Sequence, residues 1–157
     1  MEETGTDRML GIIWEPEEDV FCFRVRINLS TLKKKSQIGP DISQQELIDN
    51  PPSVITRWQF YSQVQSLFDP IGLLSPVLLR AKLLLRKTWE HDCSKLSWDN
   101  PLPADLVKEM ISFFVELFEL ELIAFPRSLL PKDRAIIGKP DLVIFSDGSI
   151  SAFGSVA

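Results

Sequence analysis

Strand-like segments lie near both ends of this chain and helical periodicity fills its middle, which restricts the folds that it can adopt. From Val20 to Ile27, apolar and polar residues alternate as they do in a half-buried β-strand. Near the other end, the apolar runs Leu142–Phe145 and Ala152–Ala157 flank a turn rich in glycine and serine. One compact domain rarely begins and ends with half-open sheets. We therefore expect an α+β chain in which helices join pieces of two sheet domains.

The N-terminal region is predicted to form an antiparallel hairpin. Residues 9–14 are predicted to be a short buried strand, and Glu15–Asp19 is predicted to be a turn because Pro16 and the acids oppose pairing. The second strand would begin at Val20. It would bury Phe21, Phe23, Val25 and Ile27 on one face and present Arg24, Arg26 and Asn28 on the other.

Between the hairpins we expect about three helices. Residues 30–55 are polar and interrupted by prolines, which favours a linker with a short helical turn at Ser43–Ile48, where Ser43 and Glu46 form a capping box. Helices are predicted over Thr56–Phe68, from Ser75 to about His91, and over Ala104–Leu122. In the second helix, Ser75 would be the N-cap, and the apolar residues cover more than one stripe. That distribution indicates burial on two sides or an exposed seam.

The composition is typical of a globular protein of one domain, or of pieces of two, with 157 residues and 45% hydrophobic content. No apolar run is long enough to span a membrane, and the acidic N-terminus is unlike a signal peptide. Cys22 and Cys93 have no metal-ligand spacing, so buried, reduced thiols are expected. These features favour a cytoplasmic or nuclear location without a membrane partner.

The net charge of −5 does not by itself indicate nucleic-acid binding, but the bases are clustered. Five bases and no acid lie between Arg24 and Gln37, and a second group lies between Arg80 and Lys87. Such patches can hold phosphates even on an acidic chain, although a solvated face is the alternative. The candidate nucleic-acid-binding residues are Arg24, Arg26, Lys33, Lys34, Lys35, Arg80, Lys82, Arg86 and Lys87.

Asp147 is the candidate catalytic and metal-binding carboxylate, because it follows an apolar strand and precedes Gly148 and Ser149. Two-metal nucleases use several carboxylates for Mg²⁺, whereas an aspartate before Gly-Ser can also be a simple turn residue. An aspartic peptidase is a rival interpretation, but its Asp-Thr-Gly or Asp-Ser-Gly order is not found here. His91 is interpreted as a surface residue at a helix end.

Several motifs, taken in order, resemble the Pol polyprotein of BEL/Pao-type long-terminal-repeat retrotransposons, a family that also carries a Pao peptidase label. The most specific is the run from Phe68 to Pro76. The other motifs are Leu10–Trp14 with Phe21–Val25, Thr56-Arg57, Ser62–Val64, Arg80–Lys82, Leu96–Asp99, Pro101–Pro103, Phe125–Arg127, Phe145–Ser149 and Ala152–Gly154.

The resemblance implies a segment that runs from the reverse-transcriptase palm to the start of RNase H. Residues 1–30 would end the palm, residues 31–140 would form a thumb or connection region, and residues 141–157 would be the first hairpin of a truncated RNase H-like domain. Asp147 would be the first RNase H carboxylate, with the polymerase aspartates upstream and further acids downstream. Mg²⁺ would act in the parent protein and would not bind tightly to this chain.

The leading hypothesis is therefore a Pol segment that handles RNA–DNA hybrid or primer-template and is catalytically incomplete alone. Its other partner would be the rest of the Pol polyprotein. An element-derived protein-interaction module, which would use the leucine-rich helix seam, and an aspartic peptidase are the alternatives.

Overall fold

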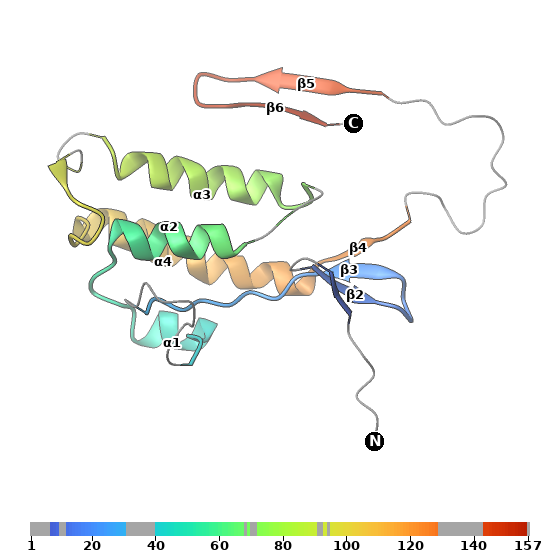
Figure 1. The fold of residues 1–157 in the computed structure, drawn as a ribbon, viewed down its shortest axis with the longest axis horizontal. Coiled ribbons are helices and arrows are strands. Elements are labelled where there is room, and N and C mark those ends of the chain that lie inside the picture. Colours follow the sequence, from blue (N-terminus) through green and yellow to red (C-terminus); the bar gives the residue numbers. More distant parts are fainter. Residues whose placement is uncertain are drawn as a thin grey trace, which may run out of the picture. The chain divides into compact units, whose positions relative to one another are not determined.

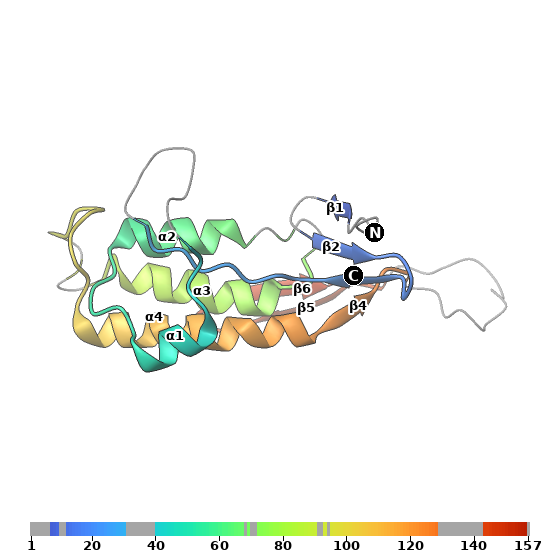
Figure 2. The ribbon, with the colours of Figure 1, turned by 90° about the horizontal axis from the view of Figure 1, so that it is seen from below.

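The computed structural model describes residues 7–9, 12–30, 40–67, 69, 72–90, 93, 95–128 and 143–156. The chain divides into two compact units, Met1–Arg127 and Ser128–Ala157. In the first unit a small antiparallel sheet lies at one end of a group of helices (Figures 1 and 2). The second unit contains a two-stranded hairpin. The α+β class predicted from the sequence is confirmed. The predicted segment boundaries at residues 30 and 140 stay predictions.

The sheet of the first unit has the order β1-β2-β3-β4, and every neighbouring pair is antiparallel. Its strands are β1 (Asp7–Met9), β2 (Ile12–Glu15), β3 (Val20–Cys22) and β4 (Ala124–Pro126). The single strand predicted over residues 9–14 is wrong, because Met9 ends β1 and pairs with Ile12 at the start of β2. The sequence does not predict strand β4, because Pro126 is typical of a break in regular structure. Proline is tolerated there because β4 is an edge strand, which needs fewer backbone donors.

The turn between β2 and β3 ties β4 to the sheet. Asp19 has a left-handed φ of 57°, and its N–H donates to the carbonyl of Glu15 at 2.9 Å. Its carboxylate accepts from the Trp14 indole N–H at 3.2 Å and from the Arg127 guanidinium at 2.5 and 3.1 Å. The backbone N–H of Arg127 also donates to the Asp19 carbonyl at 3.0 Å. One aspartate therefore links the predicted turn to a strand more than 100 residues later.

After Cys22 the chain stays extended. Glutamine side chains of helix α2 (Arg57–Ser66) form hydrogen bonds with its backbone, as a neighbouring strand would. Gln63 Oε1 accepts from the Asn28 N–H at 2.8 Å, and Gln63 Nε2 donates to the Arg26 carbonyl at 2.5 Å. Gln59 Nε2 donates to the Leu29 carbonyl, also at 2.5 Å. Because the two glutamines are four residues apart, they lie on one helical face and bind the segment at successive points.

The same segment is held from other sides as well. The Val25 N–H donates to the Glu121 carboxylate at 2.8 Å, and the Ile42 N–H donates to the Ile27 carbonyl at 2.7 Å. These bonds satisfy polar backbone groups beside a buried surface, where a missing partner costs about 1–3 kcal/mol. The predicted alternation is confirmed, since Phe23, Val25 and Ile27 are buried and the arginines between them are exposed.

The helices begin close to where the sequence predicts them. They are α1 (Gln44–Asp49), α2 (Arg57–Ser66), α3 (Ser75–Lys87) and α4 (Ala104–Leu117), and α4 continues into the 3₁₀ helix η2 (Phe118–Leu122). The Ser43 side chain caps α1 by accepting from the Glu46 N–H at 3.2 Å. Thr56 and Gln59 form a complete capping box on α2, because each side chain accepts from the backbone N–H of the other.

The start of α3 differs from the prediction. Ser75 is the first helical residue, and the N-cap is Leu74, which has no capping side chain. Asp69 supplies the missing acceptor instead, since its carboxylate accepts from the N–H groups of Leu73 and Leu74 at 2.9 and 2.7 Å. Pro76 lies in the first turn, as expected. An acid six residues upstream of Ser75 therefore fixes the backbone that leads into α3, and the N-cap predicted at Ser75 is wrong.

The core of the first unit joins the N-terminal extended segment to the helices. Its fully buried side chains include Ile27 from that segment, Phe60 from α2, and Met110, Phe113 and Phe114 from α4. Burying a side chain of this size contributes about 1.5–3 kcal/mol each. In α3 Ala81 and Leu84 are buried while Leu79 is exposed, so this helix is covered on one side. Of the helices described, none is long and apolar enough to cross a membrane.

Candidate nucleic-acid interface

The second unit places Asp147 within a strand. Strand β5 (Phe145–Gly148) pairs antiparallel with β6 (Phe153–Val156), and Asp147 lies opposite Gly154. The sequence predicts that the strand ends at Phe145, but pairing continues to Gly148 and the turn comes afterwards. Ser149 closes that turn, since its N–H donates to the Ala152 carbonyl at 2.7 Å. The strand therefore extends three residues further than the apolar run.

The Asp147 carboxylate is exposed, and one of its oxygens accepts from the Gly148 N–H at 2.8 Å. Across the hairpin, a Cβ added at Gly154 would meet no atom within 4 Å. The hairpin itself therefore does not require glycine at this position. The space beside the carboxylate is open to an approaching backbone.

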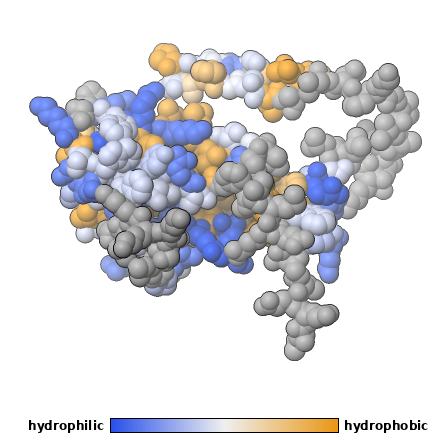
Figure 3. All heavy atoms as spheres, in the orientation of Figure 1, coloured by the Kyte–Doolittle hydropathy of each residue, from blue (hydrophilic) through white to orange (hydrophobic). Residues whose placement is uncertain are grey.

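Apolar side chains are also exposed along the hairpin, as Figure 3 shows for the face that it draws. A two-stranded hairpin buries little surface and is at best marginally stable alone. Among the described residues of this unit, the large apolar side chains that are exposed are those of Val143, Ile144, Phe145, Ile150, Phe153 and Val156.

A magnesium site requires several oxygen ligands in near-octahedral geometry. Among the described residues, no group of three or more His, Cys, Asp or Glu side chains is close enough to hold a metal ion. Asp147 alone therefore does not fit a magnesium centre, and no catalytic step can be assigned to it.

Four of the predicted nucleic-acid-binding residues are engaged in ion pairs. Arg86 pairs with Glu90 one turn later at 3.1 Å, and Lys87 joins α3 to α4 through Glu109 at 2.5 Å. The remaining pairs are Arg26 with Asp41, at 3.8 Å, and Arg80 with Glu116. A phosphate would have to compete with these carboxylates.

The pair between Arg80 and Glu116 is bidentate. Its second contact, from Arg80 Nη2 to Glu116 Oε1, is 3.1 Å, and the Ser112 hydroxyl also donates to Glu116 at 3.1 Å. The hydrogen bond from Arg80 lowers the pKa of the Glu116 carboxyl, and the bond to Glu116 raises the pKa of Arg80. Both side chains are about half exposed, so salt screens this pair.

Arg24 and Lys82 are exposed, and within the described part of the chain neither of them joins an ion pair. They are the predicted basic residues of that part whose charge is available to a phosphate. Lys33, Lys34 and Lys35 lie outside the described residues, as does His91.

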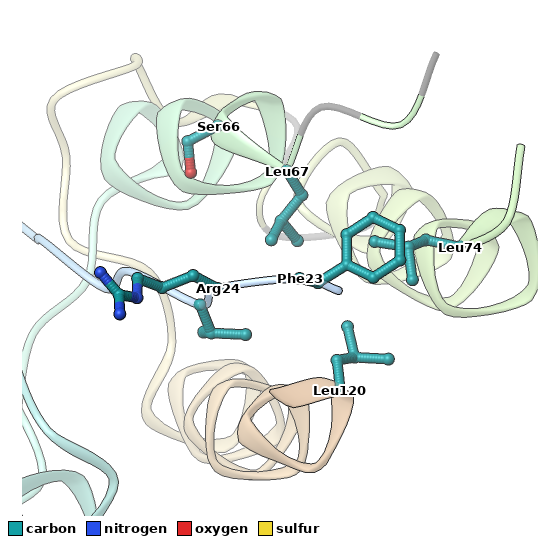
Figure 4. Close-up of a pocket in the computed structure, with 7 residues that line it drawn as sticks. Phe23, Arg24, Ser66, Leu67, Leu74 and Leu120 are labelled. Carbon is teal, nitrogen blue, oxygen red and sulfur yellow. The ribbon is translucent and has the colours of Figure 1, made fainter. Parts of the chain in front are cut away.

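Arg24 borders a small pocket of about 30 Å³ in the first unit. Figure 4 shows the apolar side chains of Phe23, Leu67, Leu74 and Leu120 gathered around it, while the Arg24 guanidinium points away from them. A cavity of this volume has room for only a few water molecules. The pocket is therefore a packing defect of the core and not a substrate site.

A buried arginine has no counterpart among the predicted site residues. Arg57, which is 1% exposed, donates to the carbonyls of Cys93 and Leu96 at 2.8 and 2.7 Å and to the carbonyl of Thr88. Its guanidinium also lies 3.7 Å from the ring centre of Trp89. Nothing in the sequence distinguishes Arg57 from a surface arginine, because three of its hydrogen bonds go to backbone carbonyls and one goes to the Thr88 hydroxyl.

Comparison with known protein families gives one match. Residues 56–157 match the model of the Pao retrotransposon-like RNaseH-like domain. The chain belongs to this family. The matched region contains α2, α3, α4, η2, β4 and the hairpin β5–β6. The resemblance to a Pao-type retrotransposon Pol segment is thereby confirmed. No curated protein and no solved structure matches the chain.

Proposed function

We propose that this Pao-type Pol segment helps to hold an RNA–DNA hybrid for an RNase H-like nuclease, to which Asp147 contributes one carboxylate. The observation that carries the proposal is the position of Asp147. It stands exposed in a paired strand of a family described as RNaseH-like, opposite a glycine that leaves room for a nucleic-acid backbone.

The nuclease site would need carboxylates besides Asp147, since the described residues do not gather a metal-binding group. In such a site Mg²⁺ would supply a polarised water and neutralise charge at the scissile phosphate. We therefore expect this chain alone to bind hybrid weakly and not to cleave it. We place it in the cytoplasm or nucleus, where retrotransposon nucleic acids are copied.

The test is fluorescence anisotropy of a labelled RNA–DNA hybrid, at several salt concentrations, together with a gel assay for cleavage in Mg²⁺. Charge reversal of Lys33, Lys34 and Lys35 is expected to weaken binding and to reduce the salt slope by about one for each phosphate that is no longer neutralised. Reversal of Arg24 should have a smaller effect of the same kind, because it removes a single charge that no described acid pairs.

Asp147→Asn is the matched control for the carboxylate. It should leave hybrid affinity in the absence of metal unchanged or slightly improved, because it removes a negative charge near the phosphates. Unchanged affinity and salt slope after reversal of all three lysines would refute their role in hybrid binding. Cleavage of the hybrid by this chain alone would refute the view that its site is incomplete.

A further inference from the structure

Four aromatic side chains gather where α2 begins and α3 ends. Trp98 is at their centre, with its ring centre 5.2 Å from that of Trp89, 5.5 Å from that of Tyr61 and 6.2 Å from that of Trp58. All three contacts are edge-to-face, with interplanar angles of 73–80°. Figures 1 and 2 show that the yellow segment between α3 and α4 forms this end of the helical group.

The cluster is held rigidly by the backbone and by a buried cation. The Trp58 N–H donates to the Trp98 carbonyl at 3.0 Å, and the Arg57 guanidinium lies against the inner face of Trp89. Because Arg57 is itself fixed by backbone carbonyls, the position of the Trp89 ring is fixed as well. When a ligand stacks on such a surface, little side-chain entropy is lost, because the rings are already fixed.

Two of the four rings are exposed to solvent. Trp89 is 46% exposed and Trp98 is 39% exposed, whereas Trp58 and Tyr61 are less exposed. Exposed aromatic surface of this kind often marks a binding site. One face of Trp89 already interacts with the Arg57 guanidinium. The ring therefore binds a second cation less favourably and is better suited to stacking against a flat, neutral ring.

Basic residues accompany the exposed rings. Leu79, Lys82 and Arg86 follow one another at helical spacing along the exposed face of α3, Trp89 follows two residues after the end of that helix, and Lys95 is exposed on the segment after it. From Lys82 to the end of α3 at Lys87 the helical rise is about 7–8 Å. Lys82 and Lys95 join no ion pair within the described part of the chain.

Acids are present beside the rings as well. Glu90 is engaged by Arg86 at 3.1 Å, and Asp99 is exposed on the loop that carries Trp98. Neither acid lies between Lys82 and Trp89 along the chain. The charge on the helix face that leads to the rings is therefore positive, which complements a polyanion.

We propose that Trp89 and Trp98 form a stacking platform for the bases of single-stranded nucleic acid, with Lys82 and Lys95 contacting its phosphates. Aromatic rings and cations in alternation are the usual means of binding single strands without sequence preference. A proline-rich peptide could also use exposed tryptophans, but it would have no need of the lysines. This proposal rests on the proposed function and deepens it. It adds a second nucleic-acid contact, which binds unpaired strand and lies on a different unit from Asp147.

The test uses the intact chain and a fluorescein-labelled DNA decamer of thymidines at low salt, followed by anisotropy and by quenching of tryptophan fluorescence. Trp89→Leu is expected to weaken binding about tenfold, since a stacked base contributes about 1–3 kcal/mol. Lys82→Glu should weaken binding several-fold and reduce the salt slope by about one to two. Lys108→Glu is the matched control, since Lys108 is an exposed lysine outside the platform, and it should bind more tightly than Lys82→Glu.

Far-UV circular dichroism separates a defect in binding from a defect in folding. If Trp89→Leu does not fold, the double change Lys82→Glu with Lys95→Glu, at exposed positions, provides the same test. Wild-type affinity in the folded variants would overturn the proposal, as would tighter binding of a proline decamer than of the DNA. If the wild type binds hybrid but not the single strand, the platform is refuted and the proposed function stands. Single-strand binding that depends on Trp89, without hybrid binding, supports the platform and refutes the proposed function.

Discussion

Arg57→Met is expected to destabilise the first unit more than any surface substitution. Methionine has about the length of the arginine stem but cannot donate hydrogen bonds. The change removes the donors to the carbonyls of Thr88, Cys93 and Leu96. The Thr88 hydroxyl also no longer accepts from Arg57, but it keeps its own acceptor, because it donates to the Leu85 carbonyl at 2.7 Å.

The magnitude follows from these interactions. The Cys93 carbonyl keeps a partner, because it also accepts from the Leu96 N–H at 3.0 Å. The Thr88 and Leu96 carbonyls lose the Arg57 donor, which costs at least about 1 kcal/mol each, and the interaction of Arg57 with the Trp89 ring contributes about 1–2 kcal/mol more in a desolvated position. Burying the guanidinium also costs desolvation free energy. Methionine avoids this cost, which partly offsets the loss of the interactions. We expect a net destabilisation of about 2–3 kcal/mol, a large fraction of the total of about 5–15 kcal/mol that is typical of a folded protein.

Equilibrium urea denaturation measures the destabilisation, and tryptophan fluorescence reports it directly because Trp89 and Trp98 lie beside the site. Arg57→Lys is the informative companion, since lysine keeps the charge but cannot reach three carbonyls in one plane, so its effect should be similar or slightly smaller. A destabilisation below about 1 kcal/mol for Arg57→Met, with an unchanged urea slope, would refute the role of the guanidinium as an organising group.

Three further predictions concern the interactions that define the first unit. Gln63→Ala should lower the free energy of unfolding by about 2–3 kcal/mol in urea denaturation, because it removes the hydrogen bonds that Gln63 makes with two backbone groups of the extended segment. Asp69→Ala should cost about 1–3 kcal/mol by the same measurement, because it removes the carboxylate that accepts two backbone hydrogen bonds just before α3. The Glu116 pKa is lowered, mainly by the bond from Arg80, so the pair stabilises the fold above the unfolded pKa of glutamate and loses this contribution as the pH falls through the folded value. Arg80→Met should therefore flatten the acid limb of a stability–pH profile by a small amount that vanishes in high salt, whereas an unchanged profile would contradict the assignment.

Local signals in the sequence predict much of this fold. The alternation from Phe23 to Ile27 is sufficient to predict which side chains are buried, and the helix predicted from Thr56 begins within one residue of the observed start of α2 at Arg57. Both depend on residues close together in the chain, where propensity and periodicity are reliable. The family resemblance depends likewise on contiguous runs, and the match over residues 56–157 confirms it.

Interactions between distant residues could not be predicted in the same way. Strand β4 forms because Arg127 and Phe125 reach the N-terminal hairpin, where Phe125 packs edge-to-face on Phe23 at 5.8 Å. No local pattern encodes that pairing. The ion pairs could not be predicted either. The clustering of bases along the sequence suggests a basic face that can bind phosphates, whereas in the structure Lys87 of α3 pairs with Glu109 of α4. Charge along a sequence does not reveal which acids the fold brings to it.

The part of the chain that folds together is larger than the region that matches the family. Residues 20–29 precede the matched region, yet Phe23, Val25 and Ile27 belong to the same apolar core as the matched helices. Their backbone is bound by Gln63 and Glu121, which both lie within the match. A matched region without this segment would expose core side chains of α2 and α4 to water and would leave those polar side chains without their partners. The extended segment is therefore an integral part of the first unit, and any experiment on the helices and their tryptophan platform requires the chain from the N-terminal hairpin onward.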